Sequence, residues 1–442
     1  FKAALSLRQP LDRNATMPGV GGRRRPQGGR SDARGAQAVW RPVAFRGAFH
    51  IRPAATEGAG MCCVAVRPLV AREVIERGEQ PLLQWHPANE EEDLEGAAEA
   101  ASAAFLTLGP DERAKVLALS AGPPDDADVG GELRRAAEQG ARRALRAAGM
   151  EPEANPNLVE EAARAATIAR INCFHGLDDG LCIYRWCSRF NHACAPNAEY
   201  GLSAGNTMRV RAIQPIAEGA EINICYIGDN ILLTARMRRK LLKDRYLFDC
   251  ICSLCTAPVD EFAARACRAC GSRVVPGGAP CSCGADAEAD ESAEEDVEVR
   301  AALLRHKWEA MPREDRGSIE GVVAAVRAML ERVEKQGFIF HVVHVRLRML
   351  LIETLVARLS CKGNNKSGEL DALADEAWRL LQEVLAWFRE PWNLAGHCWG
   401  LCLVELVAAL QAALRKLRGE KQRQRVGELD ALMRGSAEEQ RS

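Results

Sequence analysis

The stretch Arg238-Arg-Lys-Leu-Leu-Lys-Asp-Arg-Tyr-Leu-Phe-Asp-Cys-Ile-Cys-Ser-Leu-Cys255 is a basic helical segment that runs directly into three closely spaced cysteines. These cysteines are Cys250, Cys252 and Cys255. A tetrahedral zinc ion needs four soft ligands, so three thiolates from one tight turn leave the fourth to come from elsewhere in the chain. Its candidate is Cys194, within Asn191-His-Ala-Cys-Ala-Pro-Asn197. The spacing therefore predicts a structural zinc site.

A second group of cysteines follows in Cys267-Arg-Ala-Cys270-Gly271 and Cys281-Ser-Cys283-Gly284. A glycine after each pair suits a knuckle whose backbone amides approach the sulfurs. The spacing is similar to a zinc ribbon with a short second arm, so we expect Cys267, Cys270, Cys281 and Cys283 to bind a second zinc ion. The alternative is a flexible, redox-sensitive loop.

The composition excludes several classes of protein. The chain has 442 residues, of which 47% are hydrophobic and 27% charged, with a net charge of −1. These values suit two to four domains and exclude wholesale disorder, collagen and coiled coil. They also argue against a protein that binds nucleic acid through bulk electrostatics. No apolar run reaches the roughly 18 residues of a membrane helix, so we expect no membrane partner.

The seventeen cysteines indicate a reducing compartment, the nucleus, the cytoplasm or both. A disulfide framework is expected in small secreted chains, whereas these cysteines lie in a long chain that does not start with an apolar signal segment.

Composition and periodicity divide the chain into segments. Met208, Val210 and Ala212 alternate with arginines, which predicts a half-buried strand, and Pro110 marks a helix start. The predicted segments are a disordered basic leader (1–45), a strand-rich domain (46–249) with a helical insertion at about 87–150, a cysteine-rich segment (250–285), an acidic linker (286–299), and a helical domain similar to tetratricopeptide repeats (300–442).

Three segments together resemble the SET-domain protein lysine methyltransferases, especially the SMYD branch and its fungal and algal relatives. They are Phe190-Asn-His-Ala-Cys-Ala-Pro-Asn197, against the family's N-H-S-C-x-P-N, Glu218-Gly-Ala-Glu-Ile-Asn-Ile-Cys-Tyr226, against G-E-E-I-x-x-x-Y, and residues 238–255, against R-x-x-L-x-x-x-Y-x-F-x-C-x-C-x-x-C. Their order and separation also match. The resemblance covers roughly residues 46–255, and the helical C-terminus is similar to the SMYD C-terminal domain more loosely.

The resemblance implies an α+β fold: a SET domain of small curled β-sheets (β-clip type), with a helical insertion, a zinc-binding post-SET segment and an all-α C-terminal domain. It implies S-adenosylmethionine as methyl donor and a protein substrate that presents a lysine. The C-terminal helices are a candidate surface for a protein partner. The zinc-finger MYND module of SMYD proteins has no counterpart in this sequence, which points to the MYND-less relatives.

The resemblance also implies roles for individual residues. Tyr226 would be the catalytic tyrosine. Cys194, Cys250, Cys252 and Cys255 match the family's zinc ligands, in agreement with the spacing. The residues that would contact the methyl donor are Gly58, Gly60, Asn172, Asn191, His192, Tyr226 and Phe248.

Besides the tolerable replacements of serine by Ala193 and of glutamate by Ala220, two positions depart from the family pattern. Arg72 stands where the family has a turn glycine before the first strand's Glu. Cys62 stands at the second position of the glycine pair if Gly60 is its first member, and its side chain would then crowd the backbone approach to the donor.

Two other functions compete with lysine methylation. One is a catalytically inactive SET scaffold whose zinc modules and helices serve protein–protein interaction. The other is a zinc-ribbon nucleic-acid binder assisted by the basic leader. Affinity for S-adenosylmethionine separates the first from an enzyme, and salt-dependent binding to nucleic acid would reveal the second.

Overall fold

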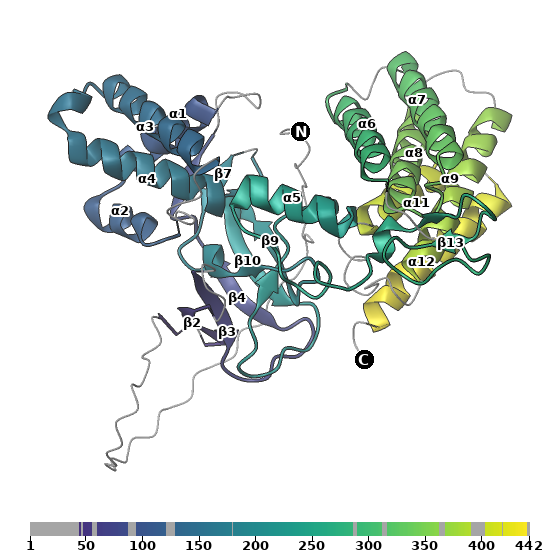
Figure 1. Cartoon of the computed structure of the whole chain (residues 1–442), viewed down its shortest axis with the longest axis horizontal. Coiled ribbons are helices and arrows are strands. Elements are labelled where there is room, and N and C mark those ends of the chain that lie inside the picture. Colours follow the sequence, from purple (N-terminus) through teal and green to yellow (C-terminus); the bar gives the residue numbers. More distant parts are fainter. Residues whose placement is uncertain are drawn as a thin grey trace, which may run out of the picture.

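The chain forms two lobes joined by the helix α5 (Ala235–Tyr246), as Figure 1 shows. The first lobe holds short strands and a helical insertion, and the second holds the C-terminal helices. The computed structural model describes residues 44–45, 47–54, 60–86, 94–120, 129–178, 180–285, 290–311, 316–361, 367–389, 403–417 and 419–439.

Small sheets build the first lobe, as the α+β SET fold requires. Three of them are antiparallel, with the strand orders β1-β2-β3, β4-β10-β9 and β5-β7-β6. The strands are β1 (Ala44–Phe45), β2 (Phe49–Pro53), β3 (Met61–Ala65), β4 (Val74–Glu79), β5 (Leu83–Trp85), β6 (Phe174–His175), β7 (Leu181–Ile183), β9 (Ala198–Ser203) and β10 (Thr207–Ala212).

The alternation predicted for residues 207–212 is confirmed in β10. Met208, Val210 and Ala212 are fully buried, whereas Arg209 and Arg211 are exposed. Successive side chains of a strand point to opposite faces, so one face of β10 joins the core of the lobe and the other faces solvent.

A short parallel pair lies beside these sheets. The strands β8 (Asn191–His192) and β11 (Asn223–Ile224) pair in register, so that Asn191 lies opposite Asn223 and His192 opposite Ile224. Two of the segments that resemble the SET family, residues 190–197 and 218–226, therefore meet in space although they are distant in the sequence. This strand pair positions Asn191 and His192.

The helical insertion extends past its predicted end at about residue 150, because a fourth helix packs with the others. Its helices are α1 (Leu94–Leu106), α2 (Pro110–Leu117), α3 (Val129–Ala147) and α4 (Pro156–Asn172). Pro110 occupies the first helical position of α2, as predicted, where its missing N–H leaves no intrahelical bond unmade. Phe105 is fully buried in a core that includes Trp85 and Ile183, so the insertion packs on the sheet of β5 and β7.

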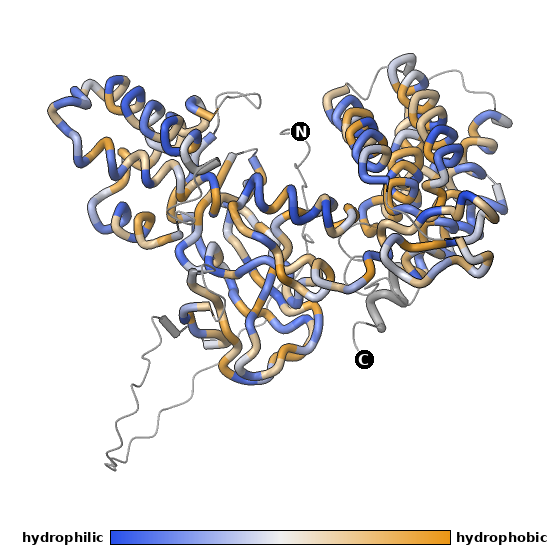
Figure 2. Tube along the Cα trace, in the orientation of Figure 1, coloured by the Kyte–Doolittle hydropathy of each residue, from blue (hydrophilic) through white to orange (hydrophobic). Residues whose placement is uncertain are grey.

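The second lobe consists of helices, with the small ribbon of β12 (Arg265–Ala266) and β13 (Arg273–Val274) beside it (Figure 1). The helices are α6 (Glu291–Glu309), α7 (Arg316–Lys335), α8 (Val342–Ser360), α9 (Ser367–Phe388), α11 (Val404–Arg415) and α12 (Glu420–Glu439). Apolar residues run through α8 (Figure 2), which is buried on nearly every face. The similarity to tetratricopeptide repeats stays a prediction. No helix in the described ranges is long and apolar enough to cross a membrane.

The basic leader lies outside the described residues except for Ala44 and Phe45. These two pair with Ile51 and His50 of β2, so the last two residues of the predicted leader belong to a β-strand.

The predicted acidic linker at 286–299 is wrong from residue 290 onward, because the helix α6 begins at Glu291. Asp290 caps this helix by accepting a hydrogen bond from the backbone N–H of Ala293 at 3.1 Å. Acidic residues in a first helical turn are favourable near the positive end of the helix dipole. The remaining residues of the predicted linker, 286–289, lie outside the described ranges.

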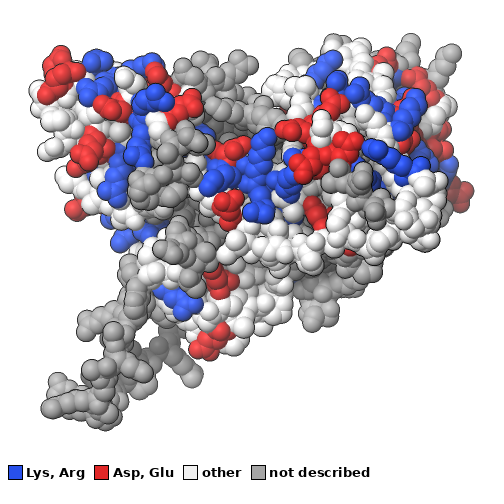
Figure 3. Space-filling view, viewed as in Figure 1, with Lys and Arg blue, Asp and Glu red and all other residues white. Residues whose placement is uncertain are grey.

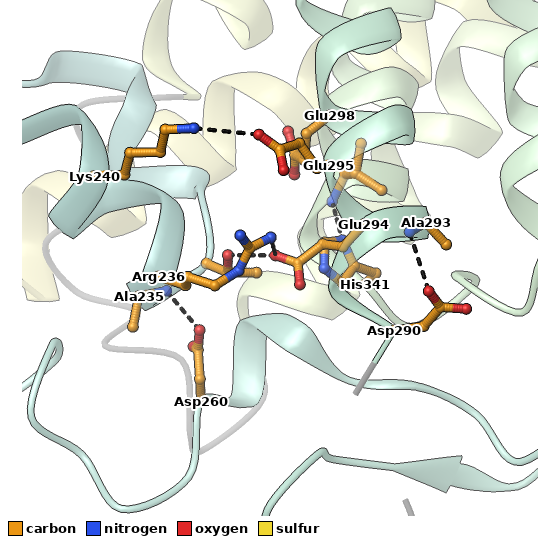
Figure 4. Close-up of polar contacts among 12 residues, drawn as sticks. Ala235, Arg236, Lys240, Asp260, Asp290, Ala293, Glu294, Glu295, Glu298 and His341 are labelled. Atoms are coloured by element: carbon orange, nitrogen blue, oxygen red, sulfur yellow. Dashed lines mark hydrogen bonds and ion pairs between the residues drawn. The ribbon is translucent and has the colours of Figure 1, made fainter. Parts of the chain in front are cut away.

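The acidic residues of α6 form the contact between the lobes (Figure 4). Glu294 is buried, accepts a hydrogen bond from the Thr234 hydroxyl at 2.7 Å and lies 3.5 Å from Arg236 of α5. Lys240, one turn further along α5, pairs with Glu295 at 3.2 Å. An acidic segment by itself indicates a chain exposed to solvent. Here, however, the acidic side chains of α6 are paired with basic side chains of α5.

The departure at Arg72 has a structural counterpart. Arg72 has a φ of +69°, in the left-handed region that glycine adopts without steric cost. Its backbone N–H donates to the carbonyl of Ala212 at 2.8 Å, which holds the turn before β4 in place. The family's preference for glycine here thus corresponds to a conformation that this chain adopts with a β-carbon present.

We expect Arg72→Gly to raise the free energy of unfolding by about 0.5–1 kcal/mol, because relief of the left-handed strain exceeds the added entropy of the unfolded chain. Urea unfolding measures the change. The matched control is Arg77→Gly in β4, where an exposed arginine lies in extended backbone and glycine should destabilise. Equal destabilisation of both variants would contradict the strain at residue 72.

Candidate active site and cysteine clusters

The four cysteines of the predicted zinc site converge, although Cys194 is distant from the others in the sequence. Their sulfur atoms lie within 4.8 Å of one another. Cys194 and Cys255 are 3.4 Å apart at the sulfurs, close to the roughly 3.8 Å that a tetrahedral zinc with 2.3 Å bonds requires. Cys194, Cys250 and Cys255 are buried, and Cys252 is half-buried. The donor set and its closure fit a structural zinc ion.

Arg238 holds the cysteine turn against the start of α5. Its side chain is fully buried and donates to the carbonyl groups of Leu233, Ile231 and Leu254. Burial alone would lower the pKa of Arg238, but the thiolates of Cys194 and Cys255 raise it above its usual value. A permanent cation beside the cluster favours the thiolate form that a metal ion needs.

His192 connects the cysteine cluster to the second resembling segment. Its Nδ1 accepts a hydrogen bond from the backbone N–H of Tyr226 at 3.0 Å, so the single proton of the neutral ring lies on Nε2. That nitrogen is 3.2 Å from the sulfur of Cys194 and donates to it. Burial lowers the pKa of His192 to about 4, which keeps the ring neutral and preserves this arrangement at neutral pH.

Tyr226 lies in an aromatic cluster next to this bridge. Its hydroxyl donates to the carbonyl of Phe190 at 2.6 Å. Its ring is 5.1 Å from that of Tyr246 and 6.4 Å from that of Phe248 (centroid distances). Burial raises the pKa of Tyr226 far above its usual value, so the phenol stays protonated.

Tyr246 was missed by sequence reasoning. It is buried at the end of α5, and its hydroxyl donates to the backbone carbonyl of Tyr226 at 3.1 Å. The signal was present, because Tyr246 is the tyrosine of the Y-x-F pattern in the third resembling segment. Its position beside Tyr226, however, depends on how α5 packs.

Asn191 is held on the other side of this cluster. Its side-chain nitrogen donates to Glu221 at 2.8 Å. Asn197 donates to the carbonyl of Glu221 and accepts from the backbone N–H of Asn223, both at 2.8 Å. This network fixes the two strands β8 and β11 and leaves the carbonyl oxygen of the Asn191 side chain as the acceptor available to a ligand.

Another predicted donor-binding residue, Asn172, lies at the end of α4. The side-chain nitrogen of Asn172 donates to the carbonyls of Ser120 and Ile168, both at 2.8 Å. Gly60 is close to Ser120, because a β-carbon at Gly60 would lie 3.9 Å from the Ser120 hydroxyl. Asn172 and Gly60 thus both lie near Ser120. Gly58 lies outside the described residues.

Cys62, the second departure, is buried in β3. Its thiol is 3.8 Å from the carbonyl oxygen of Pro53 in the neighbouring strand β2, and burial raises its pKa. The expected crowding of the donor by this side chain stays a prediction.

The second group of cysteines also converges. Cys267 and Cys283 are 3.6 Å apart at the sulfurs, Cys270 and Cys281 are 3.3 Å apart, and all four sulfurs lie within 4.8 Å of one another. Gly271, the glycine after the first pair, has a φ of +76°, as its predicted place in a knuckle requires. This set fits a second tetrahedral metal ion.

Backbone and hydroxyl donors around the second cluster favour thiolates. The side chain and backbone N–H of Ser272 lower the pKa of Cys270 to about 6. Backbone N–H groups of Ala269 and Cys270 lower the pKa of Cys267. Two cysteines of this cluster, Cys270 and Cys283, are exposed, in contrast to the first cluster.

We expect the purified protein to contain two zinc ions, and Cys252→Ser to lose one of them with at least about 2 kcal/mol of stability, because metal binding contributes directly to folding. Elemental analysis and urea unfolding measure both. Cys361→Ser, outside both clusters, should retain two ions. Full zinc content with unchanged stability in Cys252→Ser would contradict the assignment.

Comparison with known proteins supports the SET fold. The SET domain family matches residues 60–227. Human histone-lysine N-methyltransferase SMYD3 is 38% identical over 76 residues, which is 17% of each chain. Human protein-lysine N-trimethyltransferase SMYD5 is 37% identical over 99 residues, 22% of each chain. A SET and MYND domain-containing protein of Dictyostelium discoideum is 38% identical over 92 residues, 20% of this chain and 17% of its own.

The chain thus aligns with only about a fifth of the length of these curated relatives. A solved structure, Rubisco LSMT bound to AdoMet, aligns over 78% of this chain and 90% of its own, with 12% identity and a TM-score of 0.28, too low to carry an argument. The family match and the short sheets together support a SET fold for residues 60–227, within which the curated relatives align only in part.

Proposed function

We propose that this protein transfers a methyl group from S-adenosylmethionine to the side-chain amine of a lysine in a protein substrate. The observation that carries the proposal is the position of Tyr226 within the SET domain. The backbone N–H of Tyr226 donates a hydrogen bond to His192, and His192 is hydrogen-bonded in turn to the sulfur of Cys194. The ring of Tyr226 packs against the rings of Tyr246 and Phe248. This arrangement provides a rigid aromatic site with a fixed hydroxyl group.

Residues on one side of the aromatic cluster would hold the methyl donor. S-adenosylmethionine supplies an electrophilic methyl group on a positively charged sulfur. The Asn191 side-chain oxygen offers an acceptor, and the Phe248 ring, 6.0 Å from that of His192, offers a stacking surface. The Asn172 nitrogen is already committed to backbone carbonyls, so its oxygen would accept from the ammonium end of the donor. Gly60 supplies backbone groups nearby, and Gly58 is proposed for the same role.

The incoming lysine must lose its proton before it can react. From a reference pKa near 10.4, deprotonation at pH 7.4 costs roughly 4 kcal/mol. The aromatic surroundings of Tyr226 reduce this cost, because burial without a counter-ion lowers a lysine pKa. The Tyr226 hydroxyl donates a hydrogen bond to the backbone carbonyl of Phe190, so its oxygen lone pairs are free to accept from the amine and orient the nitrogen. With its pKa strongly raised, Tyr226 positions the amine and does not act as a base.

The metal sites would be structural. The first cluster provides four sulfur ligands and leaves no position open for a substrate. The proposed zinc ion fixes the turn that carries Phe248 to the strand that carries His192. The second cluster would fix the ribbon beside the C-terminal helices.

The proposal places the protein in a reducing compartment, the nucleus, the cytoplasm or both, because both clusters need reduced thiols. The C-terminal helices are a proposed surface for a protein partner.

We expect Tyr226→Phe to fold normally and to lower the rate of methyl transfer at least about 100-fold, because one preorganised polar contact with the reacting amine is removed. The assay follows labelled methyl from S-adenosylmethionine into an array of lysine peptides and proteins. Tyr184→Phe is the matched control, since its hydroxyl also donates to a backbone carbonyl at 2.6 Å in a buried site. Comparable loss of activity in both variants, or none in Tyr226→Phe, would remove Tyr226 from the mechanism.

A further inference from the structure

Two arginines lie next to the aromatic cluster without any role in the function proposed above. Arg170 is in the last turn of α4, and Arg245 is in the last turn of α5. The helices α4 and α5 pack against one another. Burial lowers the pKa of Arg170, and the charge of Arg245 lowers it further. The packing of α4 on α5 therefore holds two like charges together, an unfavourable arrangement that an anion would relieve.

Neither arginine has a carboxylate partner among the described residues. Arg245 lies over the ring of Tyr246, 5.4 Å from its centroid, and the Nε of Arg170 is buried without a hydrogen-bond acceptor. No ion pair joins the neighbouring Asp244 to either of them. An arginine donor that is buried and unsatisfied costs free energy unless a ligand provides the acceptor.

The other basic residues of α5 show the contrast. Arg236 pairs with Glu294, Lys240 with Glu295 and Lys243 with Asp249. Lysine and arginine side chains cover this helix in the space-filling view (Figure 3). Three basic residues of the helix are thus paired with carboxylates, whereas Arg245, which lies against the aromatic cluster, is not paired with one among the described residues.

Arg245 lies against Tyr246, a residue of the aromatic cluster at the proposed lysine site. Burial raises the pKa of Tyr246 to about 12, and the charges of Arg245 and Arg170 oppose that rise. Burial likewise raises the pKa of Tyr200, again opposed by Arg245. Arg245 is 5.4 Å from the ring centroid of Tyr246, which is 5.1 Å from that of Tyr226, so the separation of Arg245 and Tyr226 is at most the length of about three residues of extended peptide.

We propose that Arg170 and Arg245 bind an acidic side chain of the protein substrate, located within three residues of the target lysine. This inference rests on the proposed lysine methylation and adds a sequence preference to it. Guanidinium groups match carboxylates in geometry and are less strongly hydrated than ammonium groups, so a pair of them in a half-buried site favours Asp or Glu over neutral residues. The charge pair contributes to substrate binding and leaves the methyl-transfer step unchanged.

The experiment compares peptides with one lysine and a glutamate scanned from three residues before to three after it, against the same peptides with glutamine. Their kcat/KM is measured with the full-length, zinc-loaded protein. Binding is measured separately by fluorescence anisotropy, with norleucine in place of the lysine. We expect at least one glutamate position to be favoured about tenfold through KM, with kcat unchanged. Arg245→Gln should abolish that preference and leave the glutamine peptides unaffected.

Arg239→Gln is the matched control, because Arg239 is exposed on the same helix and should retain the preference. Arg245→Glu should reverse it in favour of a lysine at the same position. If the corresponding variant of the other arginine, Arg170→Gln, folds poorly, the two Arg245 variants still test whether the arginine pair selects an acidic side chain.

Equal kcat/KM for glutamate and glutamine at every position, or an undiminished preference in Arg245→Gln, would overturn the inference while leaving lysine methylation intact. A glutamate preference in binding without any methyl transfer would support the arginine site and contradict the methyltransferase. Absence of both would overturn the two proposals together.

Discussion

The hydrogen bonds of His192 are the interaction on which the rest of the structure depends. One ring nitrogen accepts from the backbone of Tyr226, and the other donates to the sulfur of Cys194. This neutral ring therefore couples the cysteine cluster to the tyrosine. Because Cys194 meets cysteines from beyond α5, the same bridge joins the parallel strands β8 and β11 to the turn that carries Phe248. A displacement of the cysteine cluster would therefore change the position of Tyr226 at the proposed site of methyl transfer.

The two lobes share this region. Cys194, Cys250 and Cys255 belong to the same apolar core as the C-terminal helices, which continues through Trp308 and α8. The helix α5 completes the connection, since its first turn contacts α6 (Figure 4). Its last residue, Tyr246, donates a hydrogen bond to the backbone carbonyl of Tyr226. The C-terminal helices therefore stabilise the wall of the proposed lysine site, in addition to any surface that they offer to a partner.

Local signals predicted much of this arrangement. The spacing of Cys250, Cys252 and Cys255 is sufficient by itself to predict the cluster, because metal ligands impose short and recognisable intervals. The alternation in β10 and the helix start at Pro110 are equally local. The SET fold itself followed from three motifs whose order and separation are characteristic, and the family match confirms it.

Features that depend on packing between distant elements could not be predicted. The acidic residues around Glu294 indicated a solvated linker, because their basic partners on α5 are remote in the sequence. Tyr246 and Arg245 acquire their surroundings only when α5 packs on α4. The left-handed backbone at Arg72 was indicated only as the absence of an expected glycine, and its conformation came from the structure. The roles of the donor-binding residues stay proposals for the same reason.

Calorimetric titration of the zinc-loaded protein with S-adenosylmethionine tests the central claim most directly, since it does not depend on knowing the substrate. The account predicts binding with micromolar affinity and one site per chain. A protein that unfolds cooperatively yet binds no donor up to millimolar concentration would contradict it, and would favour a SET scaffold that serves protein interaction.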